Sequence, residues 1–108
     1  MTTLIALLFS GALMYGQTNA DSFKVWGKCG MCEKRIEKAA LAVKGVDAAD
    51  WNKDTKMLEV KFDKSQTSEK QIEQAVAKAG HDTPDFRSDD KVYDKLPACC
   101  HYERKPKG

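Results

Sequence analysis

Charged side chains are absent from one part of this sequence and balanced in the rest. The first 20 of the 108 residues contain no Lys, Arg, Asp or Glu, so all 18 basic and 16 acidic side chains follow Ala20. The net charge of the whole chain is only +2. Because nucleic-acid binding calls for a clustered basic face, this balance argues against a nucleic-acid partner.

A long apolar run is absent as well. The apolar residues of the uncharged stretch begin with Leu4–Leu8 and stay well short of the roughly 20 that are needed to cross a bilayer. Thr18-Asn19-Ala20 then offers small residues at the two positions that signal peptidase reads. We interpret Met1–Ala20 as a cleaved export signal, which predicts an exported, periplasmic protein. A tethering helix is the alternative, since no Lys or Arg precedes the apolar run.

The cysteines do not have the spread of a disulfide framework. Four cysteines in a short exported chain normally indicate two structural disulfides. Here they form one Cys-x-x-Cys pair, Cys29 and Cys32, and one adjacent pair, Cys99 and Cys100. The Ser, His and acidic residues fall into no hydrolase motif, so we assign no catalytic residue and expect no enzyme.

Periodicity predicts the secondary structure. Alternating apolar residues predict strands, and apolar residues three or four apart predict helices. The expected elements are strand Ser22–Lys28, helix Glu33–Val43, strands Val46–Asn52 and Lys56–Phe62, a helix from Thr67 or Ser68 to Ala79, and a short strand His81–Phe86 that contains Pro84.

This order predicts an α+β fold of the ferredoxin-like βαββαβ type. Its four strands form an antiparallel sheet with two helices on one face, followed by a short C-terminal tail. We place the domain at 21–87 and the tail at 88–108. Within the tail, Asp89–Leu96 is expected to form one or two helical turns, which Pro97 ends.

Cys29 and Cys32 are the main candidate metal ligands. A spacing of three at the start of a helix lets both sulfurs face one ion, and the helix N-terminus favours the thiolate form. Lys28, Lys34 and Arg35 offset the negative charge. Sulfur ligands favour Cu(I), Zn(II) or a heavier thiophilic ion such as Hg(II). Two thiolates leave Zn(II) short of its usual four ligands, so Cu(I) is the favoured metal.

The segment from Phe23-Lys24-Val25-Trp26-Gly27-Lys28-Cys29-Gly30-Met31-Cys32 to Gly80-His81-Asp82 resembles the heavy-metal-associated domain family. This is the module of copper chaperones, of metal-pumping ATPase N-termini and of the periplasmic mercury-binding protein. The resemblance covers about Ser22–Phe86. It implies that Cys29 and Cys32 bind the ion and pass it on by ligand exchange. The family commonly has Met where this chain has Gly27, and Met31 either replaces that residue or is exposed.

Other candidate ligands accompany the main pair. His81 lies in the loop that, in this fold, faces the loop carrying Cys29, which we call the metal loop. It is either a third ligand, as a His at this place is in some family members, or a surface residue near the start of a strand. Cys99, Cys100 and His101 follow Pro97. Three interpretations of the tail stay open: a disulfide to Cys29 or Cys32, an incidental exposed pair, or extra ligands that fold over the metal loop.

The sequence therefore predicts a protein that binds a soft metal ion and carries, transfers or sequesters it outside the cytoplasm. Its expected partners are a metal-transporting membrane protein, another metal-binding domain, or a second copy bridged by the ion. The main alternative is a thiol–disulfide oxidoreductase that uses Cys29 and Cys32. A structural zinc module is a third hypothesis.

Overall fold

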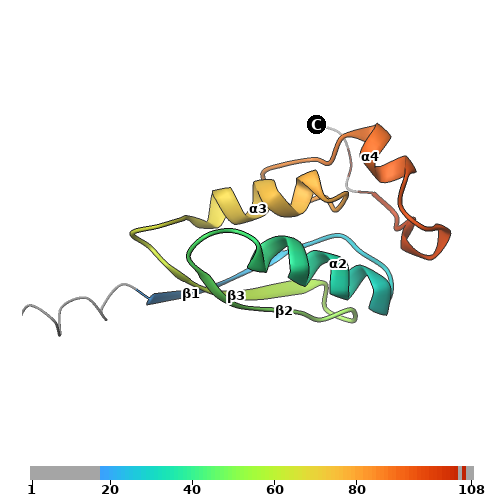
Figure 1. The fold of residues 1–108 in the computed structure, drawn as a ribbon. Coiled ribbons are helices and arrows are strands. Elements are labelled where there is room, and N and C mark those ends of the chain that lie inside the picture. Colours follow the sequence, from blue (N-terminus) through green and yellow to red (C-terminus); the bar gives the residue numbers. More distant parts are fainter. Residues whose placement is uncertain (1–17, 105, 107–108) are drawn as a thin grey trace, which may run out of the picture.

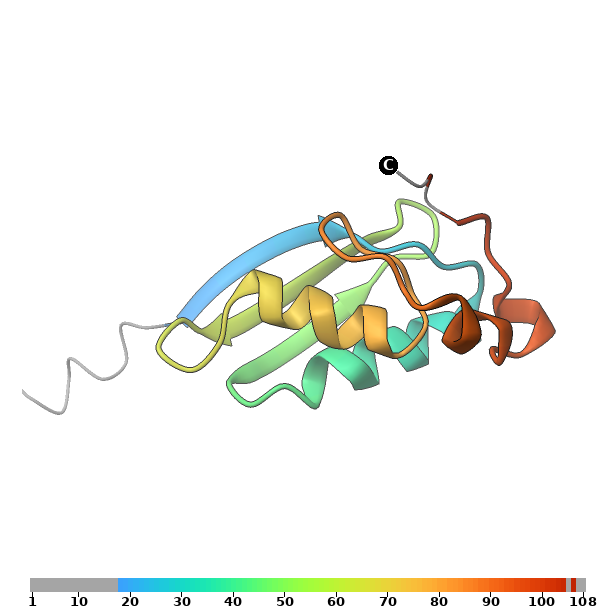
Figure 2. The ribbon, with the colours of Figure 1, turned by 90° about the horizontal axis from the view of Figure 1, so that it is seen from above.

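The computed structural model describes residues 18–104 and 106. In chain order, its elements are β1 Thr18–Lys24, α2 Gly30–Leu41, β2 Val46–Trp51, β3 Met57–Asp63, α3 Glu69–Lys78, α4 Asp90–Asp94 and the 3₁₀ turn η2 Ala98–Cys100. The two long helices cover one face of the sheet (Figure 1). Seen from above, they run along the strands (Figure 2). None of the helices in the described part of the chain is long and apolar enough to cross a membrane.

The sheet has the antiparallel strand order β1-β3-β2. Its middle strand, β3, follows the predicted alternation, because Leu58, Val60 and Phe62 are buried and the residues between them are exposed. The α+β prediction is therefore confirmed. The first strand begins four residues earlier than predicted, at Thr18.

The predicted fourth strand, His81–Phe86, is not formed, so the sheet has three strands within residues 18–104. A ladder-like bond joins this segment to the chain that follows β1, from the Trp26 N–H to the Asp82 carbonyl at 3.0 Å. The Asp82 N–H instead donates to the Tyr102 hydroxyl, also at 3.0 Å. Thr83 turns back to pair with the carbonyl of Phe86. The backbone groups that would continue the ladder are thus used by the tail and by a local turn.

Both predicted helices form, although α2 spans Gly30–Leu41 where Glu33–Val43 was predicted. Ser68 is the N-cap of α3, because its side chain accepts a hydrogen bond from the Gln71 N–H at 3.2 Å. Gly45 and Gly80 follow the two helices with φ values of +100° and +116°. Residues other than Gly rarely adopt this backbone conformation, so both positions favour Gly.

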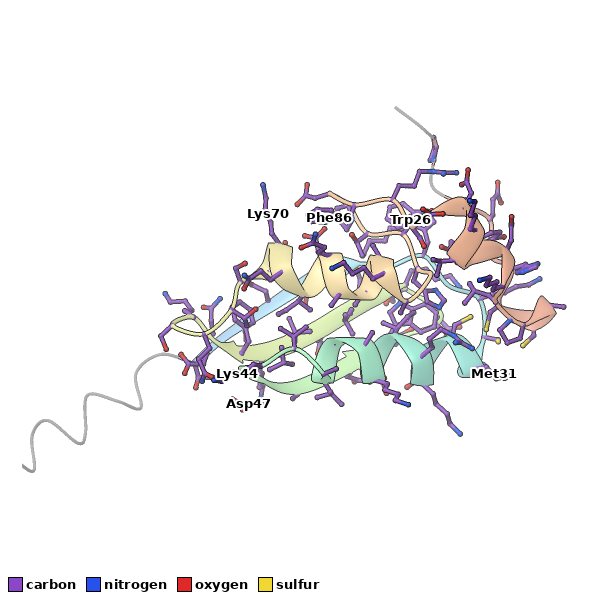
Figure 3. The ribbon with its side chains drawn as sticks, turned by 45° about the horizontal axis from the view of Figure 1, so that its top comes forward. Trp26, Met31, Lys44, Asp47, Lys70 and Phe86 are labelled. Carbon is purple, nitrogen blue, oxygen red and sulfur yellow. The ribbon has the colours of Figure 1, made fainter. Side chains whose placement is uncertain are left out.

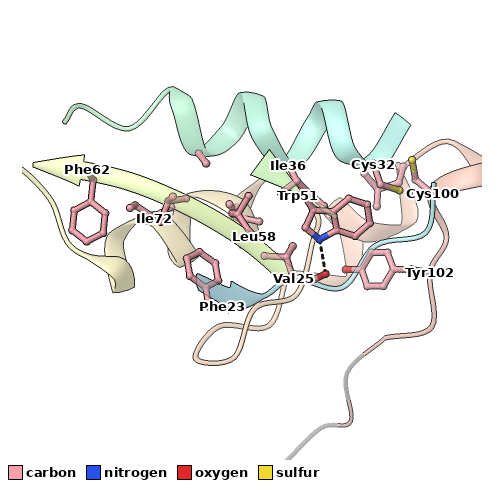
Figure 4. Packing of buried hydrophobic residues seen from close by; sticks show 14 residues of the cluster. Phe23, Val25, Cys32, Ile36, Trp51, Leu58, Phe62, Ile72, Cys100 and Tyr102 are labelled. Atoms are coloured by element: carbon pink, nitrogen blue, oxygen red, sulfur yellow. Dashed lines mark hydrogen bonds between the residues drawn. The ribbon is translucent and has the colours of Figure 1, made fainter. Parts of the chain in front are cut away.

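The tail contributes to the hydrophobic core. Leu96, Cys100 and Tyr102 are buried in the same cluster as the sheet and helix residues. In Figure 4, Cys32, Cys100 and Tyr102 lie at one end of this cluster, and Phe62 lies at the other. The tail is therefore packed as part of the domain at the end that carries the metal loop.

Residues 1–17 of the predicted export signal, Met1–Ala20, lie outside the described part of the chain. Its last three residues form the start of β1, where Thr18 pairs with Asp63. None of these three is buried, and the first buried residue of the strand is Phe23.

Candidate metal centre

Cys29 and Cys32 lie where the loop after β1 enters α2. Cys29 is the N-cap residue of the helix, with extended backbone angles, and Cys32 lies in the first turn. Residues three apart on a helix face the same way, and here the two Sγ atoms are 4.0 Å apart. Cys29 is partly exposed and Cys32 is fully buried. The loop thus presents one accessible and one internal sulfur.

The backbone makes Cys29 acidic. The amides of Cys32 and Met31, at the start of α2, lower the pKa of the Cys29 thiol from 9.0 to about 7. Unsatisfied N–H groups at a helix N-terminus stabilise a thiolate in this way. The thiolate, which is the form that binds metals, is therefore much more populated near neutral pH than in an ordinary cysteine.

Trp51 supports the loop from beneath. Its indole is almost completely buried, and its Nε1–H donates to the Val25 carbonyl at 3.0 Å (Figure 4). A Cβ atom at Gly27 would lie only 2.9 Å from two carbon atoms of the Trp51 ring. Gly27 is thus the residue that lets the loop pack on this indole. Met31 does not fill that space, because its side chain is 52% exposed at the end of the molecule that carries the tail (Figure 3).

The tail brings one of its two cysteines to the loop. The sulfurs of Cys29, Cys32 and Cys100 all lie within 4.8 Å of one another, and Cys100 is fully buried. Cys99 is exposed, and its sulfur lies 3.3 Å from the Met31 sulfur. The Cys99 carbonyl accepts a hydrogen bond from the Cys29 thiol at 3.3 Å. Burial raises the pKa of the Cys100 thiol, with further contributions from the neighbouring Cys32.

The two histidines lie apart from this group of sulfurs. His101 is exposed and stacks on Tyr93 with ring centroids 5.0 Å apart. His81 is buried, and its Nδ1 lies 2.9 Å from the Trp26 carbonyl, so Nδ1 carries the proton. Burial lowers its pKa, which keeps the ring neutral. Neither ring joins the three sulfurs among the described residues. A ligand role for either one stays a prediction.

Tyr102 holds the tail against the loop that follows α3. Its hydroxyl donates to the Gly80 carbonyl at 2.6 Å and accepts from the Asp82 N–H. Its ring stacks on His81, with centroids 5.2 Å apart. The Tyr93 hydroxyl in turn donates to the Tyr102 carbonyl at 2.7 Å. The residue two positions after Cys100 is therefore fixed to the body of the domain.

Arg104 provides a second anchor. Its guanidinium forms a two-point ion pair with Asp82, at 2.9 and 3.2 Å, and also bonds Asp90 and the Ser88 carbonyl. The Asp82 side chain is fully buried and that of Arg104 is 13% exposed. Sequence reasoning missed Tyr102, Arg104 and Asp82, because no motif or periodicity marks them.

Comparison with known proteins supports the same site. The profile of the heavy-metal-associated domain matches residues 28–82, which include Cys29 and Cys32 and end before the tail cysteines. None of the curated proteins matches the sequence.

Among solved structures, a CopZ metallochaperone has 29% identity and a TM-score of 0.58, covering 60% of this chain and 98% of its own. The N-terminal domain of a potential copper-translocating P-type ATPase from Bacillus subtilis, in its Cu(I)-loaded state, has 28% identity and a TM-score of 0.58 over 61% of this chain and 84% of its own. Oxidized MerP from Ralstonia metallidurans CH34 has 26% identity and a TM-score of 0.53 over 60% and 94%. The profile covers half of the sequence, and the chain therefore belongs to the heavy-metal-associated domain family.

Proposed function

We propose that this protein binds a soft metal ion through Cys29 and Cys32 and carries, transfers or sequesters it. The observation that carries the proposal is the pair of sulfurs 4.0 Å apart, one of them on a thiol with a pKa of about 7. Several similar structures are of copper-binding or copper-translocating proteins or their domains, and another is MerP. The family and the geometry thus support the same ligand pair.

The separation of the two sulfurs and the number of nearby ligands bear on which metal the site favours. With metal–sulfur bonds of about 2.3 Å, two ligands lie about 4.6 Å apart in a linear site, about 4.0 Å apart in a trigonal site and about 3.8 Å apart in a tetrahedral site. The observed 4.0 Å is shorter than the linear value and close to both the trigonal and the tetrahedral values. Within the described residues, no fourth Cys, His, Asp or Glu joins the sulfurs. Cu(I) is therefore the favoured cargo, ahead of Hg(II) and of Zn(II), which usually takes four ligands in structural sites.

We propose that the ion leaves by ligand exchange with another metal-binding domain or with a metal-transporting membrane protein. The exposed side of Cys29 supports this, because an incoming thiolate can reach the ion there. An ion shared by the Cys29 loops of two copies is the other arrangement that such exposure allows. The apolar, uncharged Met1–Ala20 supports export to the periplasm. N-terminal sequencing of secreted protein tests this, with Asp21 as the expected first residue.

A thiol–disulfide oxidoreductase is the second candidate function. The observation in its favour is the pKa of about 7 for Cys29, close to that of the reactive thiol of thioredoxin. An insulin-reduction assay separates the two functions. Fast turnover by the wild type that disappears in Cys29→Ser would contradict the metal-carrier proposal.

Anaerobic titration of the reduced protein tests the leading proposal. Cu(I), Zn(II) and Hg(II) are added separately, each in competition with a chromophoric chelator. We expect the wild type to take Cu(I) from the chelator and form a 1:1 complex. The double variant Cys29→Ser/Cys32→Ser should leave the Cu(I) on the chelator. A double variant that binds Cu(I) like the wild type would overturn the proposal.

A further inference from the structure

We propose that Cys100 is a third thiolate ligand, so that the tail and the metal loop together hold one ion in a three-sulfur site. This inference rests on the proposed function and deepens it. It concerns a residue outside the segment that matches the family profile, which ends at residue 82. It also gives a ligand role to Cys100 and none to Cys99, although the sequence offers no reason to distinguish the two.

The first argument is distance. The sulfurs of Cys29, Cys32 and Cys100 form a triangle in which no pair is more than 4.8 Å apart. Three sulfurs around one ion need mutual separations of about 4.0 Å. The Cys29–Cys32 pair already has this separation. The distances from the Cys100 sulfur to the other two are at most 4.8 Å, so they exceed this value by no more than about 0.8 Å.

The second argument is orientation within the tail. Cys99 and Cys100 lie in the 3₁₀ turn η2, where successive side chains point about 120° apart. The turn is closed by the Cys100 N–H, which donates to the Pro97 carbonyl at 2.8 Å. Cys100 consequently points into the protein, beside Cys32 (Figure 4), and Cys99 points to solvent. The Cys99 carbonyl, bonded to the Cys29 thiol, ties the turn to the metal loop.

The third argument is that the position of Cys100 is fixed from both sides in the chain. After it, Tyr102 bonds Gly80 and Asp82, and Arg104 forms its ion pair with the buried Asp82 carboxylate. Before it, Leu96 is buried against Gly80. Ligands held in place before the ion arrives raise affinity, because less conformational entropy is lost on binding. The contacts of the tail thus hold Cys100 in place beside Cys29 and Cys32.

The arrangement has a consequence for transfer. Cys32 and Cys100 are fully buried and only Cys29 is partly exposed, so a partner approaches the ion from the Cys29 side. A third sulfur makes the ion harder to release than it is from a two-sulfur carrier. Release then requires a competing thiolate that displaces one of the three. The structure therefore favours a protein that retains its ion until a thiolate-bearing partner docks.

The test compares two single variants of adjacent residues in the full reduced chain. Cu(I) affinity is measured by chelator competition in thiol-free, oxygen-free buffer, so that no added thiol supplies a sulfur. We expect Cys100→Ser to weaken binding by at least about tenfold, since loss of an outer-shell partner alone costs that much. Cys99→Ser is the matched control and should bind like the wild type. Equal affinities for Cys100→Ser and the wild type would overturn the inference.

X-ray absorption of the Cu(I)-loaded wild type gives a second readout that needs no variant. We expect three sulfur neighbours, and two would contradict the inference even if Cys100→Ser failed to fold. The double variant Cys29→Ser/Cys32→Ser distinguishes a failure of this inference from a failure of the proposed function. If only that variant loses binding, the ligand pair stands and the third ligand falls. If it binds like the wild type, the proposed function itself falls.

Discussion

The two cysteine pairs of this protein differ in what their spacing does to the sulfurs. Cys29 and Cys32 lie three residues apart at the start of α2, and this spacing brings both sulfurs to one point. Cys99 and Cys100 are neighbours in a 3₁₀ turn, and this spacing separates them into one outward and one inward thiol. The comparison shows that two cysteines next to each other in sequence need not belong to one site.

The pairs are also supported differently. The metal loop packs on a single buried indole, that of Trp51, through the close approach at Gly27. The tail is held by a buried ion pair and by the hydroxyl of Tyr102. The loop relies mainly on packing, whereas the tail adds a buried ion pair to its own packing in the core. Variants can therefore disturb each pair separately.

The largest effect is expected when the polar support of the tail is removed. Arg104→Met leaves the buried Asp82 carboxylate without its cationic partner, which should lower the free energy of unfolding by about 3–5 kcal/mol. Urea unfolding of the reduced protein measures this. Arg87→Met is the matched control, because Arg87 pairs with Asp90 at a more exposed site and should cost about 0–1 kcal/mol. Equal losses in the two variants would contradict the proposed role of the buried pair.

A smaller effect is expected at the apolar support of the metal loop. Gly27→Ala places a Cβ atom 2.9 Å from the Trp51 ring, and such overpacking costs about 1–3 kcal/mol. Gly30→Ala, on the other side of Cys29, meets no atom within 4 Å and should not lower stability. The measurement is again urea unfolding. If Gly27→Ala were as stable as Gly30→Ala, Trp51 would not be the support of the loop.

The smallest expected effect is the influence of the tail on the acidity of Cys29. Alkylation of Cys29 by iodoacetamide should be half-maximal near pH 7 and fall about tenfold per pH unit below that, as the thiolate becomes protonated. Cys99→Ala should shift this midpoint little, because the amides of Cys32 and Met31 lower the pKa more than Cys99 does. Mass spectrometry of the labelled peptide follows the reaction. A midpoint that returned to 9.0 in Cys99→Ala would show that the tail sets the acidity.

Much of the fold could be predicted from the sequence because its signals are local. The alternation of Leu58, Val60 and Phe62 predicted β3. Thr67 or Ser68 was predicted to cap α3, and the structure shows Ser68 as the cap. The fourth strand was predicted wrongly, because the bond between the Asp82 N–H and Tyr102 joins residues 20 positions apart. No local sequence pattern shows that a distant side chain will take a backbone N–H that a strand would need for the sheet.

The sequence by itself determined that the sulfurs of Cys29 and Cys32, the proposed ligand pair, meet at the start of α2. A Cys-x-x-Cys segment between a strand and a helix places two sulfurs together through backbone geometry alone. Only the tertiary structure decided which tail residue joins them. Cys100 reaches the site, whereas Cys99 and His101 do not, because Tyr102 and Arg104 fix the tail against a loop about 20 residues earlier in the chain. Contacts over that separation depend on packing, which the order of residues does not display.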